Sequence, residues 1–317
     1  MTDVPRRSAA ARRQTTRRRN HRAACIAVLA TAVLMLTSSF LVSPTHAVWT
    51  ATSTNPLNTF QTPPVFSQTT SYTCATGQTT LTVGAGFTLA TVTLSGGAGQ
   101  DTGSSGASGL GAVMNVTFAV TAGEVLTIRA GCKGSQSTTA GGVGYAAGGK
   151  SGSMTWSGHD GGAGGGASGI SCSGTGCTTA TLLSVAAGGG GGGGDGSTGT
   201  GGDGGDANSG GTTGIAAGTV YLGGAGGAAV GSAGSAGGSG GTPPGVGSAG
   251  SNGSITDGGG GGGGGGGYAG GGGGGGGSAS GSGGGGGSGS SFKQTAVTLV
   301  SQSSTNAGDG SVVVTVS

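Results

Sequence analysis

A stretch of eight residues, 144–151, fits the pattern G-x-x-x-x-G-K-[ST], in which backbone amides and a lysine hold the phosphates of a nucleotide. Such a loop leaves a strand and opens a helix, because amides at the helix start cradle the phosphate. The residues after Ser151 show no helical period, and glycine is so frequent here that the flanking glycines carry little information. We therefore expect no nucleotide binding at Lys150.

Asp203 and Asp206 lie in a Gly-Gly-Asp repeat that is similar to the start of a calcium-binding β-roll. The roll needs many copies and an apolar residue two positions after the aspartate, but Asn208 stands there. Only one other partial copy occurs, and it ends at Asp195. Carboxylates on a loop can still bind calcium weakly, so these two aspartates are the only metal candidates. The sequence predicts no other cofactor.

Aromatic side chains contribute most to recognition energy, so Tyr145, Trp156 and Tyr268, together with His159, form the expected contact loops. The alternative is that the aromatic rings pack over glycine surface. His159 precedes Asp160, but no serine stands in a recognisable nucleophile elbow. We therefore predict a protein that is not an enzyme.

Residues 1–47 have the layout of a secretory signal. Eight of the twelve basic residues lie within the first 22, an apolar run follows at 23–42, and small residues surround Ala47. We expect a signal helix that is cleaved after Ala47. The alternative is an uncleaved anchor, because 20 apolar residues can span a bilayer, and the membrane would then be contacted only through this segment. Either way, the sequence predicts a secreted or cell-surface protein.

Export bears on the cysteines, because an even number of them in an oxidising compartment predicts disulfides. Four cysteines follow the signal, and three pairings are open. We predict Cys172–Cys177, which closes a tight loop of small residues, and Cys74–Cys132.

The composition excludes several classes of protein. Of 317 residues, 86 are glycine and only 7% are charged. The strict glycine triplet and abundant proline of collagen are missing. After residue 22 the chain carries four basic and eight acidic residues, a formal charge of −4. A nucleic-acid binder has the opposite charge pattern, so we expect no nucleic-acid partner.

Short runs rich in Val, Leu, Ile and Thr predict antiparallel strands, and no period-3.6 pattern predicts a helix after the signal. The expected strands are 80–83, 88–94, 112–120, 125–129, 167–172, 181–186, 296–300, 311–316 and, more weakly, 219–222. We expect a turn at 121–124 to make a hairpin and the Asp309-Gly310 pair to make another. An extended polar lead at 48–78 precedes a glycine-rich β domain at 79–317.

Glycine tracts interrupt the strands at 188–194, 258–267, 270–277 and 283–287. Glycine-rich chains usually behave as flexible coils, which is one interpretation. The other is a bundle of extended polyglycine-II helices, whose outward N–H and C=O groups pair between neighbouring backbones. Strands enclose the tracts on both sides and fix their ends, which favours the bundle.

Several fragments resemble, in order, bacterial secreted glycine-rich domains and the glycine-rich extracellular region of anaplastic lymphoma kinase and leukocyte receptor tyrosine kinase. These fragments are 82–86 with 94–99, 120–128, 164–168, 182–189, 267–271, 289–292 and 308–314. The resemblance implies an antiparallel, jelly-roll-like β-sandwich carrying bundled glycine helices. It implies no kinase activity, because the kinase of those receptors is a separate domain. The cysteines are not part of the shared pattern.

Two functions are compatible with these observations. The first is a structural or adhesive protein, secreted or on the cell surface. The second is a ligand-binding module that recognises a protein or glycan through its loops.

Overall fold

The computed structural model describes residues 67–317, except 103–105, 136–139, 155–157, 198, 208–243, 254–257 and 278–280. They belong to one compact unit, Thr62–Ser317. The signal helix expected at 1–47, the weak strand at 219–222 and Trp156 lie outside the described residues.

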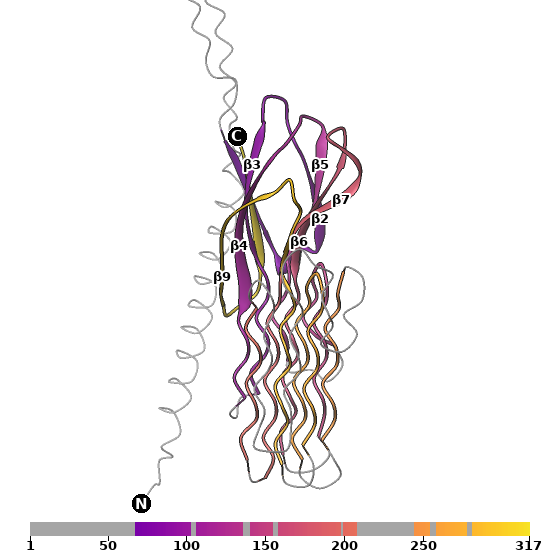
Figure 1. Ribbon diagram of the computed structural model, residues 1–317, viewed down its shortest axis with the longest axis vertical. Coiled ribbons are helices and arrows are strands. Elements are labelled where there is room, and N and C mark those ends of the chain that lie inside the picture. The colour runs from indigo at the N-terminus through magenta and orange to yellow at the C-terminus, as the bar shows by residue number, and fades with distance from the viewer. Residues whose placement is uncertain are drawn as a thin grey trace, which may run out of the picture. The chain divides into compact units, whose positions relative to one another are not determined.

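The described fold is all-β apart from one short 3₁₀ helix, and it contains two antiparallel five-stranded sheets (Figure 1). The first sheet has the strand order β1-β10-β3-β4-β9 and the second β2-β5-β6-β7-β8. The elements are β1 Gln68–Thr73, η1 Cys74–Thr76, β2 Gln78–Thr82, β3 Leu89–Ser95, β4 Gly111–Ala119, β5 Glu124–Arg129, β6 Ser168–Gly174, β7 Cys177–Ala186, β8 Phe292–Lys293, β9 Thr298–Asn306 and β10 Ser311–Val316.

One hydrophobic core joins the inner faces of the two sheets. Because side chains alternate between the faces of a strand, every second residue of β3 and β10 is buried. Leu94 and Met114 of the first sheet share this core with Ile128 and Ile170 of the second, and all four are fully buried. Burying each such side chain stabilises the fold by roughly 1.5–3 kcal/mol. The arrangement is sandwich-like.

The outer face of the first sheet carries hydroxyl side chains. One row crosses all five strands through directly paired threonines: Thr69, Thr315, Thr91, Thr117 and Thr298. The hydroxyls of Thr69 and Thr315 lie 2.8 Å apart and are hydrogen-bonded. This face is therefore polar without being charged along that row.

Each predicted strand among the described residues overlaps an observed strand, although β8 was not predicted and β9 extends beyond 296–300 to Asn306. Both predicted hairpins are wrong. The turn at 121–124 connects β4 to β5, which belong to different sheets, and Glu124 is a buried strand residue. The turn at Asp309-Gly310 connects β9 to β10, but β3 and β4 lie between these strands. A tight turn fixes a local change of direction, whereas the core decides which strand becomes the partner.

The fold also begins earlier than expected. β1 lies in the segment that was assigned to the polar lead, and it pairs with β10 along its whole length. Only Tyr72 of β1 is buried, so the strand carries little hydrophobic signal in the sequence.

Three insertions leave the strands, and their described residues run together beyond one end of the sheets (Figure 1). They are residues 96–110 between β3 and β4, 130–167 between β5 and β6, and 187–291 between β7 and β8. We call their described residues the glycine bundle. It contains extended segments that carry no strand assignment.

Candidate functional site

The amides of the glycine bundle point at three neighbours in rotation. In residues 188–194, the first, fourth and seventh amides donate to carbonyls in 260–266. The second and fifth donate to 97–100, and the third and sixth to 202–205. The donor–acceptor distances are 2.7–3.0 Å. The segment therefore repeats every three residues.

The carbonyls of the same segment address three further neighbours. The first, fourth and seventh carbonyls of 188–194 accept hydrogen bonds from amides in 283–289. The second and fifth accept from amides in 162–165, and the third accepts from the amide of Gly109. Donors and acceptors together place six chain segments around one central segment. All three insertions contribute to this ring, so the bundle ties together strands of both sheets.

A second central segment shows the same pattern without a gap. Every residue from Gly259 to Gly267 both donates and accepts a backbone hydrogen bond. Its amides address 281–287, 159–165 and 245–251 in rotation. An unpaired buried amide or carbonyl would cost free energy, and none remains along this segment.

Only glycine fits at these positions. A Cβ atom on Gly188, Gly191 or Gly263 would lie closer than 3.0 Å to backbone carbonyl atoms of a neighbouring segment. Real Cβ atoms essentially never come that close, and a backbone in contact on every side cannot move aside. Positive φ angles, the other common need for glycine, are recorded among the described residues only at Gly77, Gly86, Gly123 and Gly174, outside the tracts. The glycines of the bundle are thus required by close packing of backbones.

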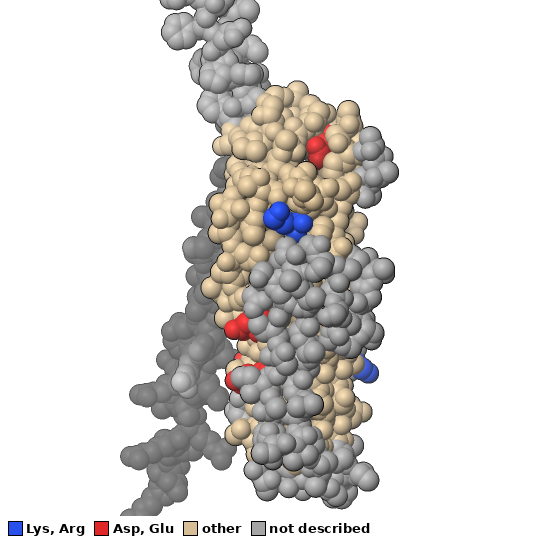
Figure 2. All heavy atoms as spheres, viewed as in Figure 1, with Lys and Arg blue, Asp and Glu red and all other residues tan. Residues whose placement is uncertain are grey.

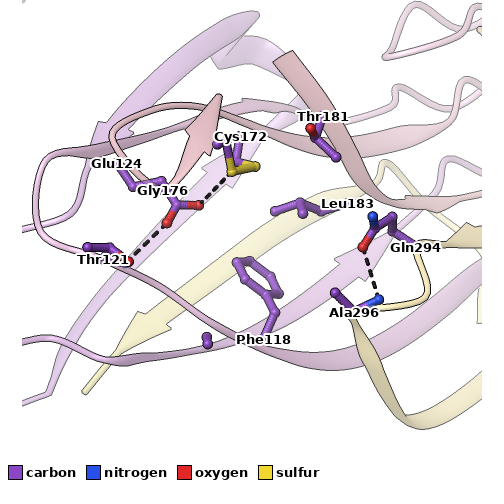
Figure 3. A pocket seen from close by; sticks show the side chains of 11 residues that line it. Phe118, Thr121, Glu124, Cys172, Gly176, Thr181, Leu183, Gln294 and Ala296 are labelled. Atoms are coloured by element: carbon purple, nitrogen blue, oxygen red, sulfur yellow. Dashed lines mark hydrogen bonds between the residues drawn. A yellow bond between two sulfur atoms is a disulfide. The ribbon is translucent and has the colours of Figure 1, made fainter. Parts of the chain in front are cut away.

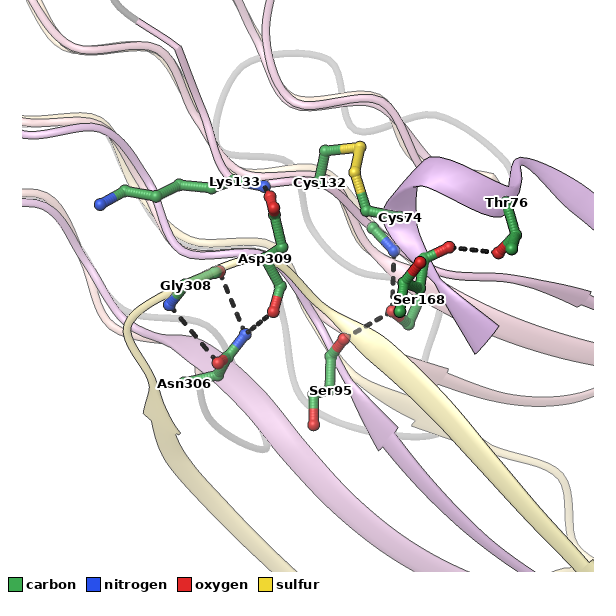
Figure 4. The surroundings of a disulfide bond; sticks show 11 residues. Cys74, Thr76, Ser95, Cys132, Lys133, Ser168, Asn306, Gly308 and Asp309 are labelled. Atoms are coloured by element: carbon green, nitrogen blue, oxygen red, sulfur yellow. Dashed lines mark hydrogen bonds between the residues drawn. A yellow bond between two sulfur atoms is a disulfide. The ribbon is translucent and has the colours of Figure 1, made fainter. Parts of the chain in front are cut away.

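Polar side chains join the bundle to the sheets (Figure 4). The hydroxyl of Ser168, which is fully buried, donates to the Ser95 carbonyl at 2.6 Å and accepts from the Gly131 amide at 2.8 Å. This one side chain therefore links β3 and β6, which lie in different sheets, to the start of the second insertion. The Asp309 carboxylate accepts from the Lys133 amide at 2.8 Å.

Both cysteine pairs expected from the sequence lie at disulfide distance. Cys74–Cys132 joins η1 to the second insertion beside the Ser168 contacts, with 5.0 Å between the Cα atoms (Figure 4). Cys172–Cys177 closes the hairpin of β6 and β7, with a Cα separation of 5.9 Å. Disulfides persist in oxidising compartments, so the two bonds indicate a non-cytoplasmic environment.

The candidate calcium ligands are engaged by the protein backbone. Asp203 Oδ1 accepts from the Ala107 amide at 2.9 Å, and Asp206 Oδ1 accepts from the Leu110 amide at 2.7 Å. The spacing of three is the repeat of the bundle, and each carboxylate takes the place of a neighbouring carbonyl. Within the described ranges, the groups of side chains that could surround a metal do not include these aspartates.

The G-x-x-x-x-G-K-[ST] stretch is also part of the bundle. The amide of Tyr145 donates to the Ala167 carbonyl, that of Gly148 to Gly142 and that of Gly149 to Gly264. These amides are therefore occupied, and no helix starts in the described part of this stretch. A phosphate would have to displace backbone hydrogen bonds to bind here.

The expected contact residues do not form one loop. Tyr145 and Tyr268 lie near the sheets, where Tyr268 stacks on Phe292 with ring centroids 4.3 Å apart. Burial raises the pKa of Tyr145, and the neighbouring Tyr268 raises it further. The Tyr145 ring packs on Gly169, where a Cβ would overlap it, in agreement with the alternative that aromatic rings cover glycine surface.

His159 lies elsewhere in the bundle. Its amide donates to the Asp195 carbonyl and its carbonyl accepts from Gly260, beside the end of the central tract farthest from the sheets. The side chain is exposed, and the carboxylate of Asp160 next to it accepts from the Met154 amide at 2.8 Å. The Asp160 carboxylate therefore accepts from backbone, as those of Asp203 and Asp206 do.

Sequence reasoning missed the junction residues Ser168, Asn306 and Asp309. Asn306 Nδ2 donates to the Gly96 carbonyl at 2.6 Å and also contacts the carbonyls of Gly308 and Asp309. Asparagine and aspartate in glycine-rich loops often form hydrogen bonds to backbone, and this tendency could have identified Asn306 and Asp309 as junction residues. Charged side chains are isolated on the described surface facing the viewer in Figure 2.

Neither a protein-family model nor a curated protein sequence matches the chain. Within the described part of the chain, no helix has the length and apolar character needed to cross a membrane.

Proposed function

We propose that the segments of the glycine bundle are polyglycine-II helices. Such a helix has about three residues per turn and no internal hydrogen bonds, so its amides point outward in three directions. The three-residue rotation of hydrogen-bond partners in 188–194 and 259–267 supports this proposal. The absence of recorded positive φ among the described tract glycines is also compatible with it.

Amide hydrogen exchange tests this architecture. The amides of Gly259–Gly267 should exchange far more slowly than those of a free glycine peptide, because each donates to a carbonyl in the bundle interior. Exchange at the rate of a free peptide would show instead that the tracts are a flexible linker.

The proposed sandwich is of the jelly-roll-like type. The chain passes repeatedly between the two sheets, and the first and last strands, β1 and β10, lie side by side. The relationship to bacterial secreted glycine-rich domains, and through them to the glycine-rich region of anaplastic lymphoma kinase and leukocyte receptor tyrosine kinase, belongs to the same proposal. It carries no kinase activity with it.

The function that we propose is that of a non-catalytic structural or adhesive protein, secreted or held at the cell surface. The single observation that supports this function is the ring of six hydrogen-bonded segments around 188–194. Such a framework resists bending, and its backbone N–H and C=O groups bond to one another and not to a ligand. The uncharged threonine row offers a surface on which adhesion by hydroxyl hydrogen bonds can occur. Two disulfides support a role outside the cytoplasm.

Attachment assays test the adhesive role. Cells that lack the chain should attach less to surfaces, and purified protein with Thr91→Val and Thr117→Val should bind those surfaces more weakly. The control is Ser184→Ala, whose hydroxyl is buried and donates to the Phe292 carbonyl. Unchanged attachment of the deletion strain would overturn the role.

A second candidate function is recognition of a protein or glycan near Tyr145 and Tyr268. The observation that favours it is the half-buried pair of tyrosines beside the stacked Phe292. A glycan array and a pull-down with the wild type and Tyr268→Ala test it. Ligands that are retained equally by both proteins would exclude this surface.

A further inference from the structure

A buried carboxylate lies at the other end of the sandwich, away from the junction. Glu124, the first residue of β5, is only 3% exposed. Its Oε2 accepts from the Thr121 amide at 3.1 Å. Its Oε1 lies 3.4 Å from Cys177 Sγ, but this sulfur is bonded to Cys172 and has no proton to donate. Within the described residues, Oε1 therefore has no N–H or O–H donor.

An unpaired buried charge is costly, and buried polar groups normally have a partner. The cost indicates that a donor from outside the described residues completes this site, and the adjoining space is where a ligand could supply it. A cavity of about 410 Å³ adjoins the carboxylate, within the size range of small-molecule sites. Gly176 keeps that side open, since a Cβ there would lie 2.8 Å from Oε2.

The walls of the cavity define the body of the ligand. Phe118 and Leu183, both almost fully buried, lie between Glu124 and the opposite wall at Gln294 (Figure 3). The Gln294 side chain accepts from the Ala296 amide at 3.0 Å and so stabilises that wall. The ligand thus meets a carboxylate at one side and an apolar surface with an aromatic ring beside it.

A divalent cation fits this site poorly. Calcium takes six to eight oxygen ligands, whereas Glu124 offers one free oxygen and the adjacent sulfurs form a disulfide. A protonated primary amine fits better, because it donates to one carboxylate oxygen in a charge-assisted hydrogen bond. Its attached carbon atoms can pack on Phe118, whose ring also attracts a cation.

We propose that this cavity binds a small primary ammonium compound with a compact apolar body, and that Glu124 Oε1 accepts the ammonium proton. The site is separate from the glycine bundle and does not depend on the structural or adhesive role. In this proposal, the end of the sandwich that lies away from the glycine bundle is a ligand-binding site.

The test uses the full exported chain with its disulfides intact. Benzylammonium chloride is the probe and benzyl alcohol is the neutral probe of similar shape. We expect benzylammonium to shift the amide NMR signals of Thr121, Glu124 and Gly176 at millimolar concentration. Benzyl alcohol should bind roughly tenfold more weakly, because its neutral hydroxyl forms a hydrogen bond to the carboxylate without the ion pair that the ammonium group adds.

Glu124→Gln keeps an acceptor for the Thr121 amide and removes the charge, so the preference for the ammonium compound should disappear. Asp101→Asn changes an exposed acid and is the matched control, with no expected effect. Ala296→Trp at the exposed rim should block both probes while leaving Glu124 in place, which keeps the test decisive if Glu124→Gln does not fold. Equal binding of the two probes, no shift at these amides, or binding that Ala296→Trp leaves unchanged would overturn the proposal.

Discussion

Replacing Gly263 by alanine adds one methyl group at the centre of the bundle. The amide of Gly263 donates to the Gly162 carbonyl at 2.9 Å, and its carbonyl accepts from Gly191 at 2.8 Å. The new Cβ would fall within 3.0 Å of the carbonyl oxygens of Gly149 and Lys150. These atoms belong to backbone that is itself hydrogen-bonded, so no flexible side chain can give way.

The expected loss of stability follows from these contacts. Overpacking of a tight interior costs about 1–3 kcal/mol and sometimes more. A backbone shift that relieves it weakens two hydrogen bonds, each contributing about 1 kcal/mol. We expect the free energy of unfolding to fall by about 3 kcal/mol or more, which lowers the melting temperature by roughly 6–12 °C for a domain of this size.

Urea titration and calorimetry measure this loss, and Gly308→Ala is the matched control. No atom lies within 4 Å of a Cβ at Gly308, and its φ is outside the left-handed region. There the change should be neutral or stabilise by about 0.4–1 kcal/mol, because alanine reduces the entropy of the unfolded chain. If Gly263→Ala is as stable as Gly308→Ala, close packing of backbones is not what requires glycine in the bundle.

Three further results are expected. Replacing Cys74 and Cys132 by serine should lower the free energy of unfolding by about 4 kcal/mol in denaturant titrations, and replacing Cys172 and Cys177 should lower it by about 2 kcal/mol. The reason is that the two disulfides join residues 58 and 5 positions apart and so close loops of different entropy. Equal losses would contradict the loop argument. Since burial raises the pKa of Tyr145 above 10.0, the folded state holds that proton more tightly than the unfolded state does. The free energy of unfolding should therefore fall as pH rises above 10.0, and it should fall less in Tyr145→Phe. Melting curves at alkaline pH that coincide for both proteins would contradict this. EDTA should leave the melting temperature unchanged, because the aspartates of the Gly-Gly-Asp repeat bind backbone amides, and a drop would reveal a bound metal.

The strands were predictable because alternation leaves a direct trace in the sequence. Val92 and Leu94 alternate with threonines in β3, and the structure buries the two aliphatic residues. The partners of the strands were not predictable, because Asp309-Gly310 specifies a turn and says nothing of the sheet that follows. β1 was missed because it buries only Tyr72.

The bundle shows a different limit. A run such as 258–267 has no side chains, so its period of three cannot be seen in the sequence. The spacing of Asp203 and Asp206 does record the period, but in the sequence it resembles only an incomplete calcium-binding repeat. Burial of Glu124 was also hidden, because a carboxylate beside a glycine turn usually faces water.

Because hydrogen-bond partners rotate with a period of three, the position of a glycine within the tract determines which neighbouring segment it contacts. Each residue of 259–267 addresses one of three neighbours according to its position modulo three. Removing one glycine would turn every later residue toward a wrong neighbour, whereas removing three would leave each later residue facing its original neighbouring segment. Length changes that such a chain tolerates should therefore come in multiples of three, although every residue in the run is the same.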